Sequence, residues 1–391
     1  MTAVEGQIRI DIYLEKQDIN RVNISSSRPL KVTDMFVGKT PDQVLNIIPM
    51  MFNICGFAQS RASLLAFQSC LNIKPDSHSE TARDLLLITE MVREHLMRIT
   101  IDWPRLFDFQ YKPHNLPFVN QLANNLKTIL FTDGRAFTLD SQLDIEHKSL
   151  VQQLSKLTQY LETYVYGCNL TDWLDIIDSD ELRMWSTQTD TVAANVVNTT
   201  FEKQWQSIGQ AKTTHLDSLD ENVFLVELEK VISDEFIAQP NWSGDYCETT
   251  SLSRQHNQPL IENLSHEYGN SLLTRIVSRL VELGRLSQQL NHLFHQLEMP
   301  GLKSTDLIAS NGLAMVETAR GKLIHQVKLD GDHIKQYKIL APTEWNFHPK
   351  GIINTIILNL PKDDRDEFEK LSHILVNTID PCVGYEIRII D

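Results

Sequence analysis

The sequence predicts a predominantly helical α+β protein that forms one large domain over residues 1–391. Long stretches carry apolar residues at helical spacing, and these predict a helix bundle. Two shorter stretches, one near each end, predict β-hairpins. The composition, 42% hydrophobic and 22% charged, is ordinary for a globular chain that is long enough to bury a sizeable core.

The first segment, residues 1–70, is predicted to hold a hairpin and the first motif. Isoleucines alternate with polar residues in the first arm of a hairpin over Gln7–Ile24, as in a half-buried strand. Thr40 and Pro41 are typical of a helix N-cap and a first helical residue. We expect Cys55 to lie at the end of the helix-and-turn segment that follows.

The middle of the chain, residues 80–300, is predicted to form the helix bundle. Helical spacing is clearest over Arg83–Ile99, over Leu150–Val165 and from about Pro259 to Leu297. Residues 186–258 are polar and weakly periodic, so we expect an excursion from the bundle and not an independent domain.

The last segment, residues 311–391, is predicted to hold a second hairpin and a C-terminal motif. The hairpin spans Lys322–Leu340, with Asp330-Gly331-Asp332 as its turn. A short acidic helix near Asp363–Ile374 precedes the closing stretch Asp380–Asp391.

Charge and cysteine content limit the classes of function. The net charge of −15 argues against nucleic acid as a partner, because phosphate binding needs a basic face. No apolar run reaches the roughly 18–20 residues of a membrane-spanning helix. The five cysteines are scattered and odd in number, and no leader pattern opens the chain, so we expect free thiols in the cytoplasm.

Six short motifs occur in order along the chain: Glu5-Gly6-Gln7-Ile8, Gly38-Lys39-Thr40-Pro41, Asn53-Ile54-Cys55-Gly56-Phe57-Ala58, Glu94-His95-Leu96, Thr318-Ala319-Arg320-Gly321 and Asp380-Pro381-Cys382-Val383-Gly384-Tyr385-Glu386-Ile387-Arg388. Together they resemble the large subunit of nickel–iron hydrogenases, over a span from Glu5 to Arg388. The resemblance implies that family's helix bundle with small peripheral β-hairpins, and it implies that the two chain ends meet beside the bundle.

The resemblance also assigns candidate metal ligands. In that family each of two motifs supplies a first cysteine that is terminal on nickel and a second that bridges nickel and iron. The first positions correspond here to Cys55 and Cys382, and the second to Ala58 and Tyr385. Neither a methyl group nor a phenol replaces a bridging thiolate, and soft thiolates select such metals. The resemblance therefore implies no nickel and no hydrogenase catalysis.

This pattern is similar to the HupK/HoxV class of large-subunit-like maturation proteins. That class implies a scaffold that transiently holds an Fe(CN)2(CO) iron fragment through Cys55 and Cys382. The fragment would come from a small hydrogenase maturation chaperone and pass toward the hydrogenase large-subunit precursor. Both are therefore expected partners.

The resemblance implies further cofactor-binding residues. Arg320 would stand near the cyanides and lower the pKa of the thiols, while Asp380 and Glu94 would orient it. Glu5 matches a proton-transfer glutamate and would hydrogen-bond a thiol, and Thr343 would offer its hydroxyl to a cyanide. Each has a structural alternative, such as an ion pair at the hairpin for Arg320 or a turn cap for Asp380.

Two other functions remain open. One is a divergent hydrogenase-like oxidoreductase subunit, which the loss of both bridging positions disfavours. The other is a metal-free structural subunit like the hydrogenase relative in respiratory complex I, which the retained cysteines, Arg320 and Asp380 disfavour. His292 and His295 with Glu298 have a spacing that suits a metal, although a solvated helix edge explains it better.

Overall fold

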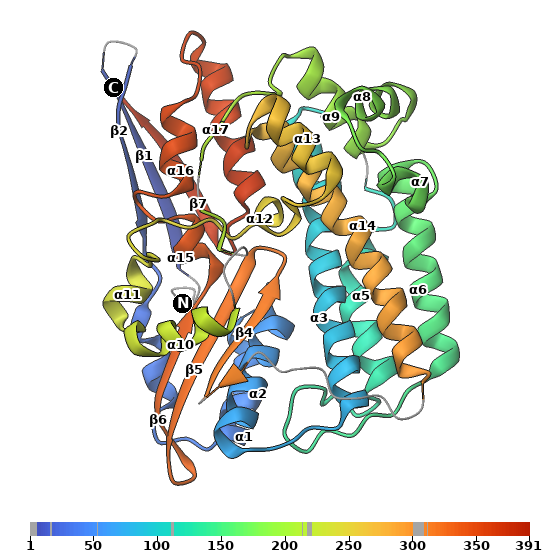
Figure 1. The fold of residues 1–391 in the computed structure, drawn as a ribbon, viewed down its shortest axis with the longest axis vertical. Helices are drawn as coiled ribbons and strands as arrows, with labels where there is room; N and C mark the ends of the chain where they lie inside the picture. Colours follow the sequence, from blue (N-terminus) through green and yellow to red (C-terminus); the bar gives the residue numbers. More distant parts are fainter. Residues whose placement is uncertain are drawn as a thin grey trace.

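The computed structural model describes residues 6–15, 18–52, 54–110, 113–212, 214–216, 221–299, 309–310 and 312–391. A layer of long helices stands beside two small β-sheets (Figure 1). The predicted α+β class with a helix bundle and peripheral β-structure is therefore confirmed. Among the helices of these residues, none is both long and apolar enough to cross a membrane.

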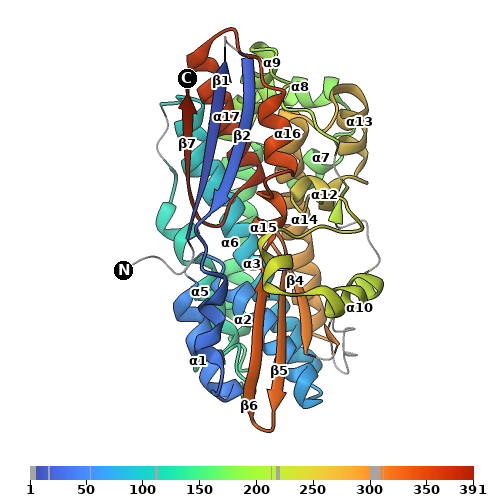
Figure 2. The same cartoon turned by 90° about the vertical axis from the view of Figure 1, so that its left-hand side faces the viewer.

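The first sheet joins the two ends of the chain. Strand β1 (Gln7–Glu15) pairs antiparallel with β2 (Asp18–Ser26) and parallel with β7 (Gly384–Ile390). Figure 2 shows the three strands side by side along one edge of the molecule. The alternating isoleucines of β1 are fully buried, as the sequence pattern predicted. This pairing brings the C-terminal motif next to the N-terminal hairpin.

The second sheet contains the predicted hairpin and is larger than predicted. Its strands, in spatial order, are β3 (Ala309–Ser310), β4 (Leu313–Thr318), β5 (Gly321–Asp330) and β6 (His333–Leu340). Strand β4 also pairs with β5 through a tight turn at Ala319 and Arg320. Gly321 closes this turn with φ +127°, and a Cβ there would lie 2.2 Å from the carbonyl oxygen of Thr249. The turn therefore requires glycine after Arg320.

The bundle consists of long helices that run alongside one another (Figure 1). They are α3 (Ser77–Met97), α5 (Leu116–Leu130), α6 (His147–Leu161) and α14 (Leu272–Leu297). The last predicted helix is in fact two, because Gly269 ends α13 (Pro259–Tyr268) with φ +73° and the Ser271 side chain caps α14.

The other helices connect and cover these layers. They are the 3₁₀ segment η1 (Leu30–Phe36), α1 (Pro41–Met51), α2 (Gly56–Leu71), the π-helical turns η2 (Arg98–Asp102) and η3 (Glu162–Tyr166), α4 (Trp103–Leu106), α7 (Leu170–Leu174), α8 (Ser179–Gln188), α9 (Val192–Glu202), α10 (Glu221–Val231), α11 (Asp234–Ala238), α12 (Ser251–Gln255), α15 (Pro342–Asn346), α16 (Ile352–Leu358) and α17 (Arg365–Ile379). Thr40 and Pro41 begin α1 as predicted, with a capping box. Within residues 186–258, α9 buries Val196 and Val197 in the main core.

Candidate functional site

The structure brings the two candidate cysteines together. Cys55 and Cys382 line one cavity, where about 430 Å³ is free of protein atoms when the open solvent at its mouth is included. Cys55 follows α1 after a short connection, as expected, and is also the N-cap of α2. Cys382 lies between α17 and β7, in the segment that the first sheet carries to this place. Thiols 327 positions apart therefore face the same small space.

Burial dominates the acid–base behaviour of both thiols. Loss of solvent raises the pKa of Cys55, and the nearby Cys382 and Glu90 raise it further against the lowering effect of Arg320. Burial also raises the pKa of Cys382, despite the lowering effects of Arg28 and Arg320. Arg320 lowers the pKa of both thiols, as expected, but desolvation outweighs its charge, so neither thiol has a lowered pKa. Both thiols are held neutral at pH 7 in the metal-free protein.

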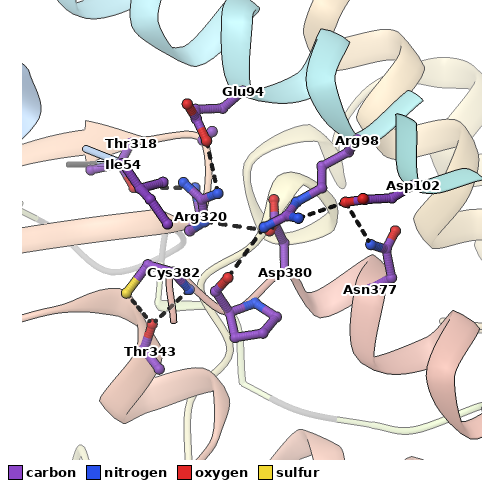
Figure 3. Close-up of polar contacts among 12 residues, drawn as sticks. Ile54, Glu94, Arg98, Asp102, Thr318, Arg320, Thr343, Asn377, Asp380 and Cys382 are labelled. Atoms are coloured by element: carbon purple, nitrogen blue, oxygen red, sulfur yellow. Dashed lines mark hydrogen bonds and ion pairs between the residues drawn. The ribbon is translucent and has the colours of Figure 1, made fainter. Parts of the chain in front are cut away.

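Arg320 makes the two carboxylate contacts that the resemblance implied (Figure 3). Its Nη2 donates to Oε2 of Glu94 at 2.8 Å, and its Nε lies 3.3 Å from Oδ1 of Asp380. The side chain is 3% exposed and also lines the thiol cavity. The guanidinium is therefore fixed at the cavity wall by two carboxylates from distant parts of the chain.

Asp380 is shared by three arginines. Oδ1 accepts a 2.7 Å hydrogen bond from Nε of Arg98, and Oδ2 lies 3.5 Å from Nη2 of Arg279. Together with Arg320, these cations hold the pKa of the Asp380 carboxyl well below its ordinary value, against the effect of burial. Asp380 is also the C-cap of α17, with φ +63°, so its structural role and its role beside Arg320 coexist.

Thr343 contacts the second cysteine directly. Its hydroxyl oxygen lies 3.0 Å from Sγ of Cys382 and accepts the backbone N–H of Cys382 at 3.5 Å (Figure 3). Since the oxygen already accepts from that N–H, the hydroxyl proton is free to point at the sulfur. The residue predicted to reach a cyanide thus hydrogen-bonds a candidate ligand.

Arg28 is a cavity residue that sequence reasoning missed. It lines the thiol cavity close enough to Cys382 and Cys55 to interact with both electrostatically. Its Nη1 donates to Oε1 of Glu344 at 2.8 Å, and both side chains are largely buried. Arg28 lies in the short connection after β2 and belongs to none of the six motifs, so the resemblance did not point to it. A second cation therefore stands at the thiols.

Glu90 was also missed. Its two carboxylate oxygens accept the backbone N–H groups of Phe57 and Ala58, each at 2.9 Å, at the start of α2. Burial raises the pKa of Glu90 to about 7, against these two hydrogen bonds. A signal was available, since Glu90, Glu94 and Arg98 recur every four residues on a helix face that is otherwise buried.

Glu5, Ala58 and Tyr385 are the remaining positions of the motifs. Glu5 lies outside the described residues. Ala58 is fully buried beside Glu90, and the hydroxyl of Tyr385 lies 3.4 Å from Nδ1 of His373. Among the described residues, no group of three His, Cys, Asp or Glu side chains is arranged to hold a metal ion. Of the residues that line the cavity, Cys55 and Cys382 are the two that carry thiols, the soft ligands that a metal such as iron could use.

The fold defines the general class of this protein. It is similar to the nickel–iron–selenium hydrogenase of Desulfovibrio vulgaris Hildenborough in the reduced state, with a TM-score of 0.67, 15% identity and 94% of each chain covered. It is also similar to the hydrogenase of Desulfomicrobium baculatum, with a TM-score of 0.65, 14% identity and 95% of each chain covered. The chain thus has the hydrogenase large-subunit fold.

Comparison of sequences shows which proteins with this fold the chain resembles. Residues 243–383 match the family described as nickel-dependent hydrogenase. The chain is 27% identical to the hydrogenase expression/formation protein HoxV of Cupriavidus necator, with 93% of this chain and 92% of that protein covered. It is 25% identical to the protein of the same description, HupK, of Rhizobium leguminosarum bv. viciae, with 98% and 96% covered. The resemblance to large-subunit-like maturation proteins of the HupK/HoxV class is confirmed.

Proposed function

We propose that this protein is a non-catalytic scaffold in the maturation of nickel–iron hydrogenase. It binds the Fe(CN)2(CO) fragment transiently through Cys55 and Cys382 and passes it toward the large-subunit precursor. One observation carries this proposal, which is that the two thiols line a single cavity beside two guanidinium groups. The names of its relatives, hydrogenase expression/formation proteins, support a role in maturation.

The chemistry of the cavity suits an iron fragment that carries anionic ligands. Thiolates are soft ligands for iron, and binding requires both sulfurs to lose their protons. Arg28 and Arg320 provide positive charge for the thiolates and N–H donors for cyanide nitrogens. Two thiolates without nickel hold the fragment by fewer protein bonds than the four thiolates of a complete nickel–iron centre, two of which are also shared with the second metal. The site therefore suits handover better than permanent retention.

The same cavity disfavours hydrogen turnover. The positions that the resemblance assigns to bridging cysteines carry Ala58 and Tyr385, and neither side chain offers a thiolate. We therefore propose that nickel does not bind. The proposed partners are a small hydrogenase maturation chaperone as donor and the large-subunit precursor as acceptor, with the exchange in the cytoplasm.

Infrared spectroscopy and metal analysis test this function. The protein is purified without oxygen from cells that express the hydrogenase maturation proteins. We expect cyanide and carbonyl stretching bands, with iron present and nickel absent. C55S and C382S should each lose the bands while keeping the far-UV circular dichroism of the parent. The matched control is C168S, because Cys168 lies outside the cavity.

The outcomes separate the three candidate functions. Nickel in the site together with hydrogen-dependent dye reduction would establish an oxidoreductase. Absence of the bands, when the donor chaperone from the same cells is loaded, would establish a metal-free role. A loaded C55S or C382S variant would remove that cysteine from the site.

Partner exchange is tested separately. The loaded protein is incubated with the metal-free large-subunit precursor, and the two are separated by affinity tags. The carbonyl band should move to the precursor, and retention of the whole band on this protein would contradict the transfer step.

A further inference from the structure

A line of buried polar side chains leads away from Cys55 into the interface between α2 and the second sheet. Nε2 of Gln59 donates to Sγ of Cys55 at 3.8 Å, within reach for a hydrogen bond to sulfur. Oε1 of Gln59 lies 2.8 Å from Nε2 of His325, and Nδ1 of His325 lies 2.8 Å from the hydroxyl of Tyr337. The three side chains are at most 2% exposed.

Local structure places these residues in one row. Gln59 lies one helical turn after Cys55 on α2, so the two side chains share a helix face. His325 pairs with Ile339 in the register of β5 and β6, and Tyr337 lies two residues before Ile339. His325 and Tyr337 therefore point to the same face of the sheet, which α2 covers.

The hydrogen bonds of this row all run in one direction. Burial and the nearby Arg28 lower the pKa of His325 to about 3, so its ring is neutral at pH 7 and carries one N–H. Because Oε1 of Gln59 only accepts hydrogen bonds, that N–H is on Nε2. Nδ1 then accepts the hydroxyl proton of Tyr337. Every donor in the row points toward Cys55.

We propose that Tyr337, His325 and Gln59 form a directed chain of hydrogen-bond donors that ends on the Cys55 sulfur and weakens its bond to a bound iron. The proposal rests on the proposed function. A hydrogen bond to a ligating sulfur withdraws electron density from the metal bond. The hydroxyl of Thr343 lies 3.0 Å from the Cys382 sulfur and would donate to it once the thiol has lost its proton, so each ligating sulfur would have one neutral donor. Gln59, His325 and Tyr337 are positioning residues that set how readily the fragment leaves.

Packing alone does not explain why three polar side chains lie at this buried interface. The other side chains between α2 and the sheet are mostly apolar, with Phe67, Leu323 and Val327 around the polar groups, although Ser63 adds a buried hydroxyl beside Tyr337. Placing three polar side chains there costs stability unless each one is hydrogen-bonded. Apolar side chains would fill the same space without that requirement. The feature that apolar side chains could not supply is an N–H at the Cys55 sulfur.

The first test uses the protein without cargo. Histidine ring ¹⁵N resonances report which nitrogen carries the proton, and H325Q identifies the signals of His325. In the parent protein we expect the ring proton of His325 on Nε2. In Y337F the hydroxyl that donates to Nδ1 is absent, so we expect the proton to leave Nε2 in part of the molecules. A proton on Nδ1 in the parent protein would overturn the donor chain, whatever the cargo is.

The second test uses the loaded protein. In Q59L the sulfur should donate more strongly, so the carbonyl band should move to lower wavenumber and transfer to the precursor should slow. Y337F should move the band in the same direction by a smaller amount. The matched control is Q68L, because Gln68 is buried on the same helix but contacts Glu80. Unchanged bands in Q59L and Y337F would overturn the donor chain alone, whereas a parent protein without bands would overturn the proposed function.

Discussion

Replacing Asp380 by asparagine tests how the arginines of the site are held. Asparagine has the same shape and tolerates the left-handed backbone of this position, so D380N removes charge with little change in geometry. The variant leaves the guanidinium groups of Arg98, Arg279 and Arg320 near one another without their shared carboxylate. The substitution should therefore destabilise the fold.

The expected loss follows from the burial of these groups. Removing one partner from a buried ion pair costs about 3–5 kcal/mol, because the remaining charge is left without compensation. Asp380 is 2% exposed and Arg320 is 3% exposed, so solvent screens the pair little. With an unfolding entropy of about 2.1 cal/mol/K per residue, the midpoint temperature of this chain should fall by about 4–6 °C.

The pH dependence gives a sharper test, because the folded-state pKa of Asp380 lies below its ordinary value of 3.8. A carboxyl with a lowered pKa stabilises the fold above its unfolded pKa and loses that effect as the pH falls toward the folded value. The difference between parent and D380N should thus be constant from pH 5 to pH 8 and shrink below about pH 4.

Urea unfolding followed by circular dichroism measures both quantities. The control is D140N, which removes the exposed carboxylate that pairs with Arg135 and should change nothing measurable. A loss below about 1 kcal/mol in D380N, or a difference that does not depend on pH, would refute the view that Asp380 anchors the cations.

Three other variants test neighbouring features. The pKa of Glu90 rises from 4.5 to about 7 on folding, so this carboxyl should lower the stability of the parent as the pH rises from 5 to 8. E90Q cannot titrate, so its unfolding free energy in urea should fall by on the order of 2–3 kcal/mol less than that of the parent over the same range. In G321A, strain at φ +127° and the contact with Thr249 should lower the unfolding free energy by about 2–4 kcal/mol, and a loss below 1 kcal/mol would contradict the close approach. T343V should lower the unfolding free energy measured in urea by about 0.5–1.5 kcal/mol and move the carbonyl band to lower wavenumber, because Cys382 loses a hydrogen-bond donor. An unmoved band would mean that the hydroxyl does not reach the sulfur of the loaded protein.

The parts of the fold that sequence patterns predicted are the local ones. Alternation predicted the buried face of β1, and helical spacing predicted α3, α6 and α14, because each pattern reflects which side of one element meets the core. The break at Gly269 was missed because the apolar spacing continues across it. The parallel pairing of β1 with β7 was beyond local patterns, since it depends on contacts between the chain ends.

The candidate site also has residues that were predicted from the sequence and residues that were not. That Cys55 and Cys382 would meet came from the resemblance to a known family, because a spacing of hundreds of residues does not determine a distance in space. Arg28 and Gln59 carry no motif, and their roles arise only from packing against residues of distant segments. Charged or polar residues in otherwise buried stretches were the available signal, as with Glu90 on α3.

The charges of the cavity are balanced without a metal. Arg28 is paired with Glu344, and Arg320 with Glu94 and Asp380, so neither guanidinium depends on a thiolate for its stability. The thiols, with raised pKa values, are neutral in the metal-free protein. A structural metal site usually folds only with its metal, because the ligands repel one another or remain unpaired without it. In this cavity the guanidinium groups are paired and the thiols neutral without a metal, as a protein that receives and releases a metal fragment requires in its empty state. The balanced charges thus support the proposed role of a carrier over that of a resident metal centre.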